Sequence, residues 1–418
     1  MAVPLAPDAP GAESTLRLRA LATAGDADAV PIVALAGGPG QSAVALAAAF
    51  ERMLRPVAGH RPLIVFDQRG TGRSGLLRCP ALERAAGRLA APSARCARTL
   101  GPARAHHLTA DSVADLDAVR AELGGERIAI YAVSYGSRLA LAYAAAHPER
   151  VERIVLDSPV PLAGPDPLQR ATLRAIPRVL RSVCARGCPG AGPRPGRDLR
   201  RLVARWRHGG DPGARRRAAL LDAVLAGEWA PRLRRLLPGA VRAALAGDGR
   251  RLARLVRAGT ATVRAPQPPA LFSAAAHAAT VCGEVALPWP PAAPPARRAA
   301  ALRKAVARLP GRATGPFDRA TVAASPTVDL CRRWPAAADR PRAVAPRTPT
   351  LVLAGGHDLL TPLADSRRLA GQLPDGRLAV APRAGHNVLA RPDGSRILAV
   401  VRAFLADRPS GLPTSPDE

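Results

Sequence analysis

Lysine and aromatic side chains are scarce in this sequence. Lys304 is the one lysine among 61 basic residues, and aromatic residues make up 3% of the 418. The net charge of +29 is therefore carried almost wholly by arginine, which is spread along the chain beside abundant alanine, glycine and proline. A nucleic-acid-binding protein normally gathers mixed basic residues on a recognisable module. We therefore expect an arginine-coated globular protein with no nucleic-acid partner.

Long apolar runs and metal-binding spacings are also missing. Arginine and proline interrupt every alanine-rich run, so no stretch approaches the ~20 apolar residues of a membrane-spanning helix. The six cysteines form no C-x-x-C pair, and no histidine stands at zinc-finger spacing. These absences argue against a membrane span and a structural zinc site, and we expect neither a metal nor an organic cofactor.

An even number of cysteines is compatible with three disulfides, which would indicate an oxidising compartment. Fifteen pairings are possible, and six buried thiols in a cytosolic protein are the alternative. Pairing of neighbours along the sequence would give Cys79–Cys96, Cys184–Cys188 and Cys282–Cys331. The first residues after Met1 lack the basic start and apolar run of a signal peptide.

The hydrophobic pattern alternates between strands and helices at both ends of the chain. Short β-rich runs predict strands at residues 16–21, 31–36, 61–66, 127–133, 153–156, 350–354 and 377–380. Helical spacing predicts helices between them, at 111–123, 137–146, 363–373 and 396–405. Residues 161–335 show only helical runs and a proline-rich break. This order predicts an α/β fold with a mostly parallel sheet, built from residues 1–160 and 336–418, that carries a helical cap at 161–335.

Ser134 lies where a predicted strand gives way to a predicted helix, in the run Tyr131-Ala-Val-Ser-Tyr-Gly136. This is the context of the G-x-S-x-G nucleophile elbow, whose strained turn holds the serine hydroxyl clear of the sheet. Gly136 supplies the second small residue of the motif, whereas Ala132 replaces the first glycine. The alternative is an ordinary serine at the start of a helix.

A serine hydroxyl needs a base, and in the order Ser…Asp/Glu…His the base follows the nucleophile. His386 and Asp358 each follow a predicted strand near the end of the chain. In an open α/β sheet these positions converge at the carboxyl edge, so we predict that Asp358 orients His386. His357 is interpreted as a loop residue, and the adjacent His106 and His107 as surface residues.

Two backbone N–H groups are expected to hold the oxyanion. One belongs to Tyr135, the residue after the nucleophile, and the other to Gly38 in a Gly-Gly-Pro-Gly turn after an earlier strand. The glycine-rich run 67–75 lacks the Gly-Lys-Ser/Thr ending of a phosphate loop. We interpret it as a structural loop in which Asp67 and Arg69 pair internally.

Several runs together resemble the prolyl iminopeptidase and tripeptidyl aminopeptidase family of serine peptidases, which has the α/β-hydrolase fold. The runs are Leu35-Ala-Gly-Gly-Pro-Gly-Gln-Ser42, Phe66-Asp-Gln-Arg-Gly-Thr-Gly-Arg-Ser-Gly75, Ala132-Val-Ser-Tyr-Gly-Ser137, Val281-Cys-Gly-Glu284, Leu330-Cys-Arg-Arg-Trp-Pro335 and the late Gly-Gly-His-Asp and Gly-His segments. The resemblance covers nearly the whole chain and is weakest at 162–280.

The resemblance implies a Ser134–Asp358–His386 triad and a short peptide substrate with a free N-terminus. Such exopeptidases bind the α-amino group through acidic cap residues, for which Glu284 is our candidate and Asp329 a second one. Members of this family normally carry an export signal, and the start of this sequence, near Val3-Pro-Leu5, resembles a point inside the family's mature domain. We expect export if a signal stands upstream, and a cytoplasmic protein if the given start is the true one.

Two other functions share the same residues. An esterase or amidase on small molecules would use an identical triad, because specificity depends on the pockets around it. A non-catalytic α/β-hydrolase-fold protein would bind a partner or anionic polymer through its arginine-rich face. Haloalkane dehalogenases and epoxide hydrolases are disfavoured because they place Asp where this chain has Ser134. The sequence gives no indication of oligomeric state.

Overall fold

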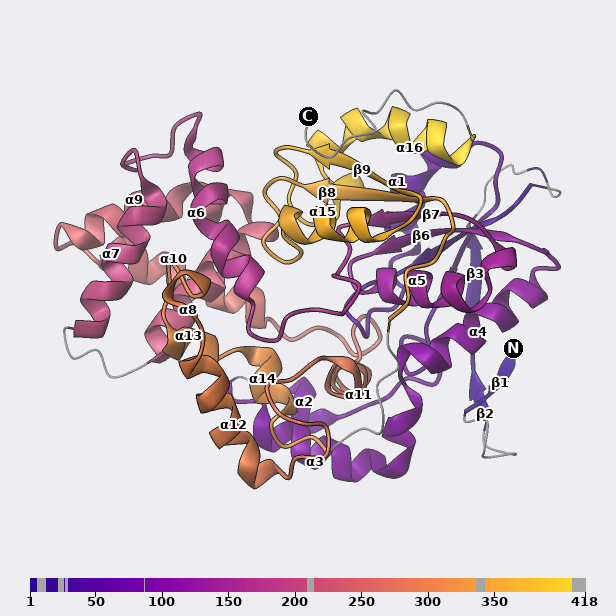
Figure 1. Cartoon of the computed structure of the whole chain (residues 1–418), viewed down its shortest axis with the longest axis horizontal. Helices are drawn as coiled ribbons and strands as arrows, with labels where there is room; N and C mark the ends of the chain where they lie inside the picture. The colour runs from indigo at the N-terminus through magenta and orange to yellow at the C-terminus, as the bar shows by residue number, and fades with distance from the viewer. Residues whose placement is uncertain are drawn as a thin grey trace.

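Seven strands form one twisted sheet in a computed structural model that describes residues 1–5, 13–21, 26, 29–85, 87–208, 214–335 and 343–407 (Figure 1). Their order is β3-β5-β4-β6-β7-β8-β9; β3 runs antiparallel to β5, and the other pairs are parallel. A separate antiparallel pair, β1 and β2, lies near the N-terminus. The strands are β1 (Ala2–Pro4), β2 (Glu13–Thr15), β3 (Leu18–Leu21), β4 (Ile32–Leu35), β5 (Leu63–Phe66), β6 (Ile128–Val133), β7 (Val151–Asp157), β8 (Thr350–Gly355) and β9 (Gly376–Ala381).

Helices cover both faces of this sheet. Along β4, Ile32 packs in one apolar cluster with Phe50, whereas the next residue, Val33, packs in another with Leu139. A parallel strand that is buried on both faces reads as a continuous apolar run, which is why these strands could be predicted. The covering helices are α1 (Ala47–Ala58) and α16 (Leu398–Leu405) on one face and α4 (Thr109–Glu122), α5 (Gly136–Ala146) and α15 (Leu363–Gln372) on the other.

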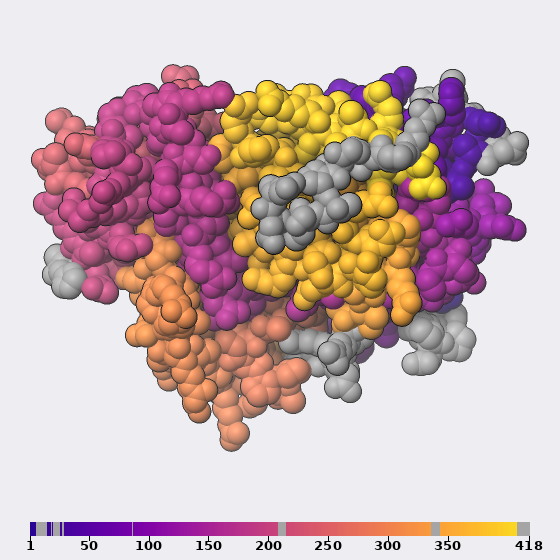
Figure 2. Space-filling view, turned by 45° about the horizontal axis from the view of Figure 1, so that its top comes forward, coloured from indigo at the N-terminus to yellow at the C-terminus, as the bar shows by residue number. Residues whose placement is uncertain are grey.

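A helical region lies between β7 and β8, and no strand occurs among its described residues. Its first helices form a lobe beside the sheet, and its later ones lie with α2 (Pro80–Glu83) and α3 (Ala90–Leu100), as Figure 1 shows. In the space-filling view the lobe abuts the C-terminal part of the core (Figure 2). The region comprises α6 (Arg170–Cys184), α7 (Pro195–His208), α8 (Ala214–Leu225), η3 (Ala226–Glu228), α9 (Pro231–Leu245), α10 (Arg250–Arg264), α11 (Ala274–Glu284), α12 (Pro295–Ala307), α13 (Arg319–Ala323) and α14 (Pro326–Cys331).

This region packs around an apolar cluster that includes Leu173, Leu220 and Trp334 and extends to Leu82 of α2 and Cys96 of α3. The predicted fold, a mostly parallel sheet with an inserted helical cap, is confirmed. The predicted domain boundary at residue 336 falls outside the described residues. In the part of the chain that the structure describes, no helix is long and apolar enough to cross a membrane.

The positive charge gathers in the first helices of the cap. Residues 161–265 contain 23 arginines and six acidic residues, a net charge of +17. Residues 1–160 contain 18 arginines and 15 acidic residues, a net charge of +3. The imbalance arises mainly because arginine is denser in the cap, with 23 in 105 residues against 18 in the first 160, and acidic residues are also sparser there.

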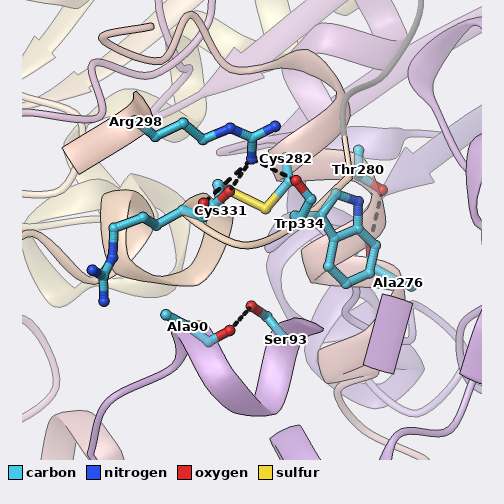
Figure 3. Close-up of a disulfide and its surroundings, with 9 residues drawn as sticks. Ala90, Ser93, Ala276, Thr280, Cys282, Arg298, Cys331 and Trp334 are labelled. Atoms are coloured by element: carbon cyan, nitrogen blue, oxygen red, sulfur yellow. Dashed lines mark hydrogen bonds between the residues drawn. A yellow bond between two sulfur atoms is a disulfide. The ribbon is translucent and has the colours of Figure 1, made fainter. Parts of the chain in front are cut away.

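Two disulfides are present, Cys184–Cys188 and Cys282–Cys331. The third bridge of the neighbour pairing is not formed: Cys79 and Cys96 are buried thiols, and burial together with the adjacent Cys79 raises the pKa of Cys96. Figure 3 shows Cys282–Cys331 joining α11 to α14. Arg298 lies beside this bridge and donates to the carbonyl oxygens of Cys331 at 3.0 Å and Trp334 at 2.5 Å.

The two bridges should contribute unequally to stability. They span sequence separations of 49 and 4 residues, and a cross-link constrains the unfolded chain more when its loop is longer. Replacing Cys282 and Cys331 by serine should lower the free energy of unfolding by about 4 kcal/mol, against about 2 kcal/mol for the Cys184 and Cys188 pair. Urea unfolding of the two double variants measures both values. A larger loss from the short bridge would contradict the expectation.

Candidate active site

Ser134 occupies a sharp turn between β6 and α5. Its φ of 55° lies in the left-handed region, which residues other than glycine rarely adopt and which clusters at functional sites. The backbone N–H of Ser134 donates to the carbonyl of Asp157 at 2.9 Å, so the end of β7 supports the turn. The strained serine that the motif predicted is therefore present at the carboxyl edge of the sheet.

The two small residues that flank Ser134 in the motif, Ala132 and Gly136, are small for different structural reasons. A Cβ atom at Gly136 would lie 2.7 Å from the carbonyl oxygen of Ala36, so no side chain fits there. Ala132 is fully buried within β6, opposite Leu35 on one side and Leu156 on the other. The fold thus accommodates the methyl group that replaces the first glycine of the motif.

The turn after β4 approaches Ser134 closely. A Cβ atom at Gly37 would lie 2.9 Å from the Cβ atom of Ser134. The cap holds this turn: His277 Nδ1 lies 2.9 Å from the carbonyl oxygen of Pro39. Within the described part of the chain, the N–H groups of Gly38 and Tyr135 have no hydrogen-bond acceptor. The N–H of Tyr135, the residue after Ser134, and that of Gly38, the residue after Gly37, are therefore available as the two donors that an oxyanion hole requires.

Asp358 and His386 meet beyond the ends of β8 and β9. His386 Nδ1 lies 2.9 Å from Asp358 Oδ2, and Thr361 Oγ1 donates to the same carboxylate oxygen at 2.7 Å. Asp358 Oδ1 accepts the backbone N–H groups of Leu360 at 2.8 Å and Thr361 at 2.9 Å. Because every contact is a donor, Asp358 is held as a fully buried carboxylate aimed at the imidazole.

Burial and neighbouring charges act in opposite directions on this pair. Burial disfavours the carboxylate of Asp358, yet His386 and the hydrogen bonds from Thr361 outweigh it, so the pKa of Asp358 is lowered. Burial also disfavours the imidazolium of His386, but the charge of Asp358, with Glu228 and Asp157, raises the pKa of His386 above its ordinary value. The charge of Asp358 thus favours the protonated imidazole, as a general base that takes up a proton requires.

A second buried carboxylate fixes the loop that carries His386. Asp157, at the end of β7, accepts the backbone N–H groups of Val388 at 2.6 Å and Leu389 at 2.9 Å. The hydroxyl of Ser158 accepts the N–H of Asn387 at 2.9 Å. Burial raises the pKa of Asp157, against these hydrogen bonds. The loop is thus anchored directly after the histidine.

A cavity of about 430 Å³ is lined in part by the sequence neighbours of Ser134 and His386. Its walls include Val133, which precedes Ser134, and Asn387, which follows His386, with Phe50 and Met53 of α1. Across the described residues, no hydrogen bond joins the Ser134 hydroxyl to His386. Such catalytic contacts often tighten only when substrate binds.

Glu284 lies at the end of α11, next to the nucleophile turn. Its carboxylate accepts the Tyr135 hydroxyl at 2.5 Å, the Thr109 hydroxyl at 2.9 Å and the Arg138 Nε at 3.2 Å, as well as the N–H of Thr109. Both oxygens are therefore engaged by donors of the protein itself. Its role in binding an α-amino group stays a prediction.

Two predictions outside the triad are wrong. Asp67 does not pair with Arg69: its carboxylate accepts the Ser42 hydroxyl at 2.6 Å, and Arg69 instead pairs with Asp115 at 2.6 Å. A loop that turns after its strand separates charges that are close in sequence. His107 is buried rather than exposed, and burial lowers its pKa to about 4.

Sequence reasoning missed Glu228, which is 2% exposed and accepts the N–H of His386 at 2.9 Å. It lies in the cap, 158 residues from the histidine, and no local motif marks it. Of the residues that the structure describes, no group of three or more His, Cys, Asp or Glu side chains is placed to hold a metal ion.

Two family models match the chain, and each covers part of the sheet core together with the adjoining part of the cap. Residues 30–183 match the alpha/beta hydrolase fold, and residues 316–410 match a family described as TAP-like protein. The chain has the α/β-hydrolase fold. The first match contains Ser134 and the second contains Asp358 and His386, so the family resemblance read from the sequence is confirmed for this α/β-hydrolase.

Curated relatives of this α/β-hydrolase are peptidases. A proline iminopeptidase of Neisseria gonorrhoeae is 33% identical over 132 residues, which cover 32% of this chain and 33% of that protein. Serine protease Hip1 of Mycobacterium bovis is 36% identical over 107 residues, or 24% of this chain and 21% of that protein. The chain thus spans a third or less of these relatives' length. A solved esterase from Thermogutta terrifontis is 17% identical, with a TM-score of 0.42 over 97% of this chain and 98% of that one.

Proposed function

We propose that this α/β-hydrolase is a serine aminopeptidase that releases N-terminal proline or a short peptide, such as a tripeptide, from peptide substrates. The observation that carries the proposal is the buried Asp358–His386 pair at the same sheet edge as the strained Ser134. The curated relatives, which are peptidases, support the choice of a peptide bond.

In the proposed mechanism, the Ser134 hydroxyl attacks the carbonyl carbon of the scissile bond while His386 Nε2 takes its proton. The resulting oxyanion accepts the N–H groups of Gly38 and Tyr135. The C–N bond then breaks, and His386 passes the proton to the leaving amine. A water molecule, deprotonated by His386, attacks the acyl-enzyme and returns Ser134 to its hydroxyl form.

Asp358 has two roles in these steps. Its hydrogen bond at 2.9 Å favours the tautomer with the proton of His386 on Nδ1, which would leave Nε2 free to act as the base. Its charge also stabilises the imidazolium that forms when Ser134 loses its proton. The helical cap would restrict the site to short peptides, which fits exopeptidase rather than endopeptidase action.

A matched substrate panel tests the proposal. Pro-, Ala- and Ala-Ala-Pro-p-nitroanilides with a free amine would be compared with their N-blocked forms and with p-nitrophenyl butyrate. We expect hydrolysis of the free anilides only, and the preferred length would separate iminopeptidase from tripeptidyl activity. Equal rates on blocked anilides, or cleavage of the ester alone, would overturn the aminopeptidase and leave an esterase or amidase.

Replacing Glu284 by glutamine tests the predicted amine contact. If Glu284 binds the α-amino group, the variant should raise KM for free anilides about tenfold, the effect of losing a charged hydrogen bond, and should leave ester cleavage unchanged. A loss shared equally by anilides and ester would contradict the contact. It would assign Glu284 to holding Tyr135, whose hydroxyl it accepts.

We also propose that the protein works in an oxidising compartment outside the cytoplasm. The Cys184–Cys188 and Cys282–Cys331 bridges support this location, because disulfides persist where thiols are not kept reduced. Thiol titration of protein isolated from its source without reductant should find two reactive sulfhydryls under denaturing conditions, those of Cys79 and Cys96.

A further inference from the structure

Glu228 is a cap residue whose carboxylate reaches into the loops of the catalytic pair. Its Oε2 accepts the backbone N–H of His386 at 2.9 Å, and its Oε1 accepts the backbone N–H of Leu359, the residue after Asp358, at 2.9 Å. The side chain is completely buried. One carboxylate therefore ties together the two loops whose spacing sets the Asp358–His386 distance.

Arg234 completes this arrangement from the start of α9. Its Nη2 donates to Glu228 Oε1, and its Nη1 donates to the carbonyl oxygen of His357 at 2.9 Å. The guanidinium thus compensates the buried carboxylate and also holds the residue before Asp358. A buried charge without a partner would be strongly destabilising, so the two side chains form one unit.

Glu228 packs closely against Gly385, the residue before His386. A Cβ atom at Gly385 would lie 2.5 Å from Glu228 Oε2, so the carboxylate occupies the space of a side chain there. Two further cap contacts hold the loop of Asp358: Thr172 Oγ1 donates to the carbonyl of Leu359 at 2.9 Å, and Ser182 Oγ lies 2.8 Å from His357 Nε2.

We propose that Glu228, compensated by Arg234, is a positioning residue through which the helical cap fixes Asp358 and His386 in their productive geometry. The inference rests on the proposed function, since it assigns these two residues to catalysis. It makes the cap a structural part of the catalytic machinery as well as a cover over it. Glu228 touches backbone groups of the loops, and it acts on the reaction only through His386 and Asp358.

The charge of Glu228 should affect the pH dependence of activity, which a purely structural role would not do. The charged groups that face His386 are Asp358 from the β8 loop, Asp157 from the end of β7, Glu228 and Arg234 from the cap, and Arg391, which donates to the carbonyl of His386 at 2.8 Å. Because the negative charge of Glu228 favours the imidazolium, its removal lowers the pKa of His386. The acidic limb of activity should then move to lower pH.

The test compares E228Q with E228D. E228Q keeps the size but removes the charge, whereas E228D keeps the charge but is one methylene too short to reach both N–H groups. Both variants should lose about 10- to 100-fold in kcat, with little change in KM, because misplaced catalytic groups slow the chemistry. Only E228Q should also shift the acidic limb downward. E152Q is the matched control, since it removes a partly buried ion pair with Arg61 remote from the catalytic pair.

The rate of labelling by a fluorophosphonate gives a readout that does not depend on the natural substrate. We expect both Glu228 variants to label about 10- to 100-fold more slowly than the parent, and E152Q to label like the parent. Parent-like labelling and kcat in E228Q and E228D, or a rise in KM alone, would overturn the inference while leaving the serine hydrolase intact. If E228Q does not fold, the kcat and labelling rate of E228D decide the question. Failure of the parent itself to label would overturn the proposed function and this inference with it.

Discussion

Replacing Ser134 by alanine should lower kcat by about 10⁴- to 10⁶-fold. The substitution removes only the hydroxyl that attacks the substrate, whereas the support of the turn comes from the backbone N–H of Ser134, bonded to Asp157. The fold should therefore persist while acyl transfer stops. Turnover of the best free anilide, measured at enzyme concentrations high enough to follow the residual rate, gives the ratio.

Ser93→Ala is the control for this variant. Ser93 is a fully buried serine in α3, and Figure 3 shows its hydroxyl donating to the carbonyl oxygen of Ala90, at 3.0 Å, near the Cys282–Cys331 bridge. It should keep kcat within about twofold of the parent, since its hydroxyl contacts only its own helix. A Ser134→Ala protein that is folded and retains more than about a tenth of the parent activity would remove Ser134 from the mechanism.

Replacing Asp358 by asparagine should lower kcat about 10⁴-fold. An amide can present its NH₂ group to His386 and so favour the wrong tautomer of the imidazole. Removal of the charge also lowers the pKa of His386, because Asp358 makes the largest of the contributions that raise it against burial. The acidic limb of kcat/KM should therefore move to lower pH, which a pH–rate profile of the residual activity measures.

Asp365→Asn is the matched control for Asp358→Asn. Asp365 is a buried aspartate in α15 that pairs with Arg368 at 3.1 Å, outside the candidate site. It should leave kcat and its pH profile unchanged, although the protein would lose some stability. An Asp358→Asn protein with the parent's pH profile would contradict the assignment of Asp358 as the partner of His386.

The sheet and the Asp358–His386 pair could be predicted because they depend on local patterns. Asp358 follows β8, whose burial on both faces leaves a continuous apolar run, and His386 follows the shorter apolar run of the edge strand β9, which places both at the carboxyl edge. Ser134 could be recognised because a nucleophile elbow needs a strand, a turn and a small residue such as Gly136 in immediate succession.

What could not be predicted depends on contacts between distant segments. Glu228 stands in an alanine-rich helical stretch, and only the folded cap brings it to His386. The burial of His107 follows from its packing against the loop at Gly70, which its neighbours in sequence do not reveal. Arg69 pairs with Asp115 of α4 and not with Asp67, although Asp67 is closer in sequence.

The most direct test of the account is the site of a covalent adduct. The purified protein would be treated with a fluorophosphonate, and its intact mass and peptide map would be compared with those of the Ser134→Ala variant. The account predicts one adduct per chain, located on Ser134 and absent from the variant. An adduct on another residue, or no adduct on a folded protein, would contradict Ser134 as the nucleophile.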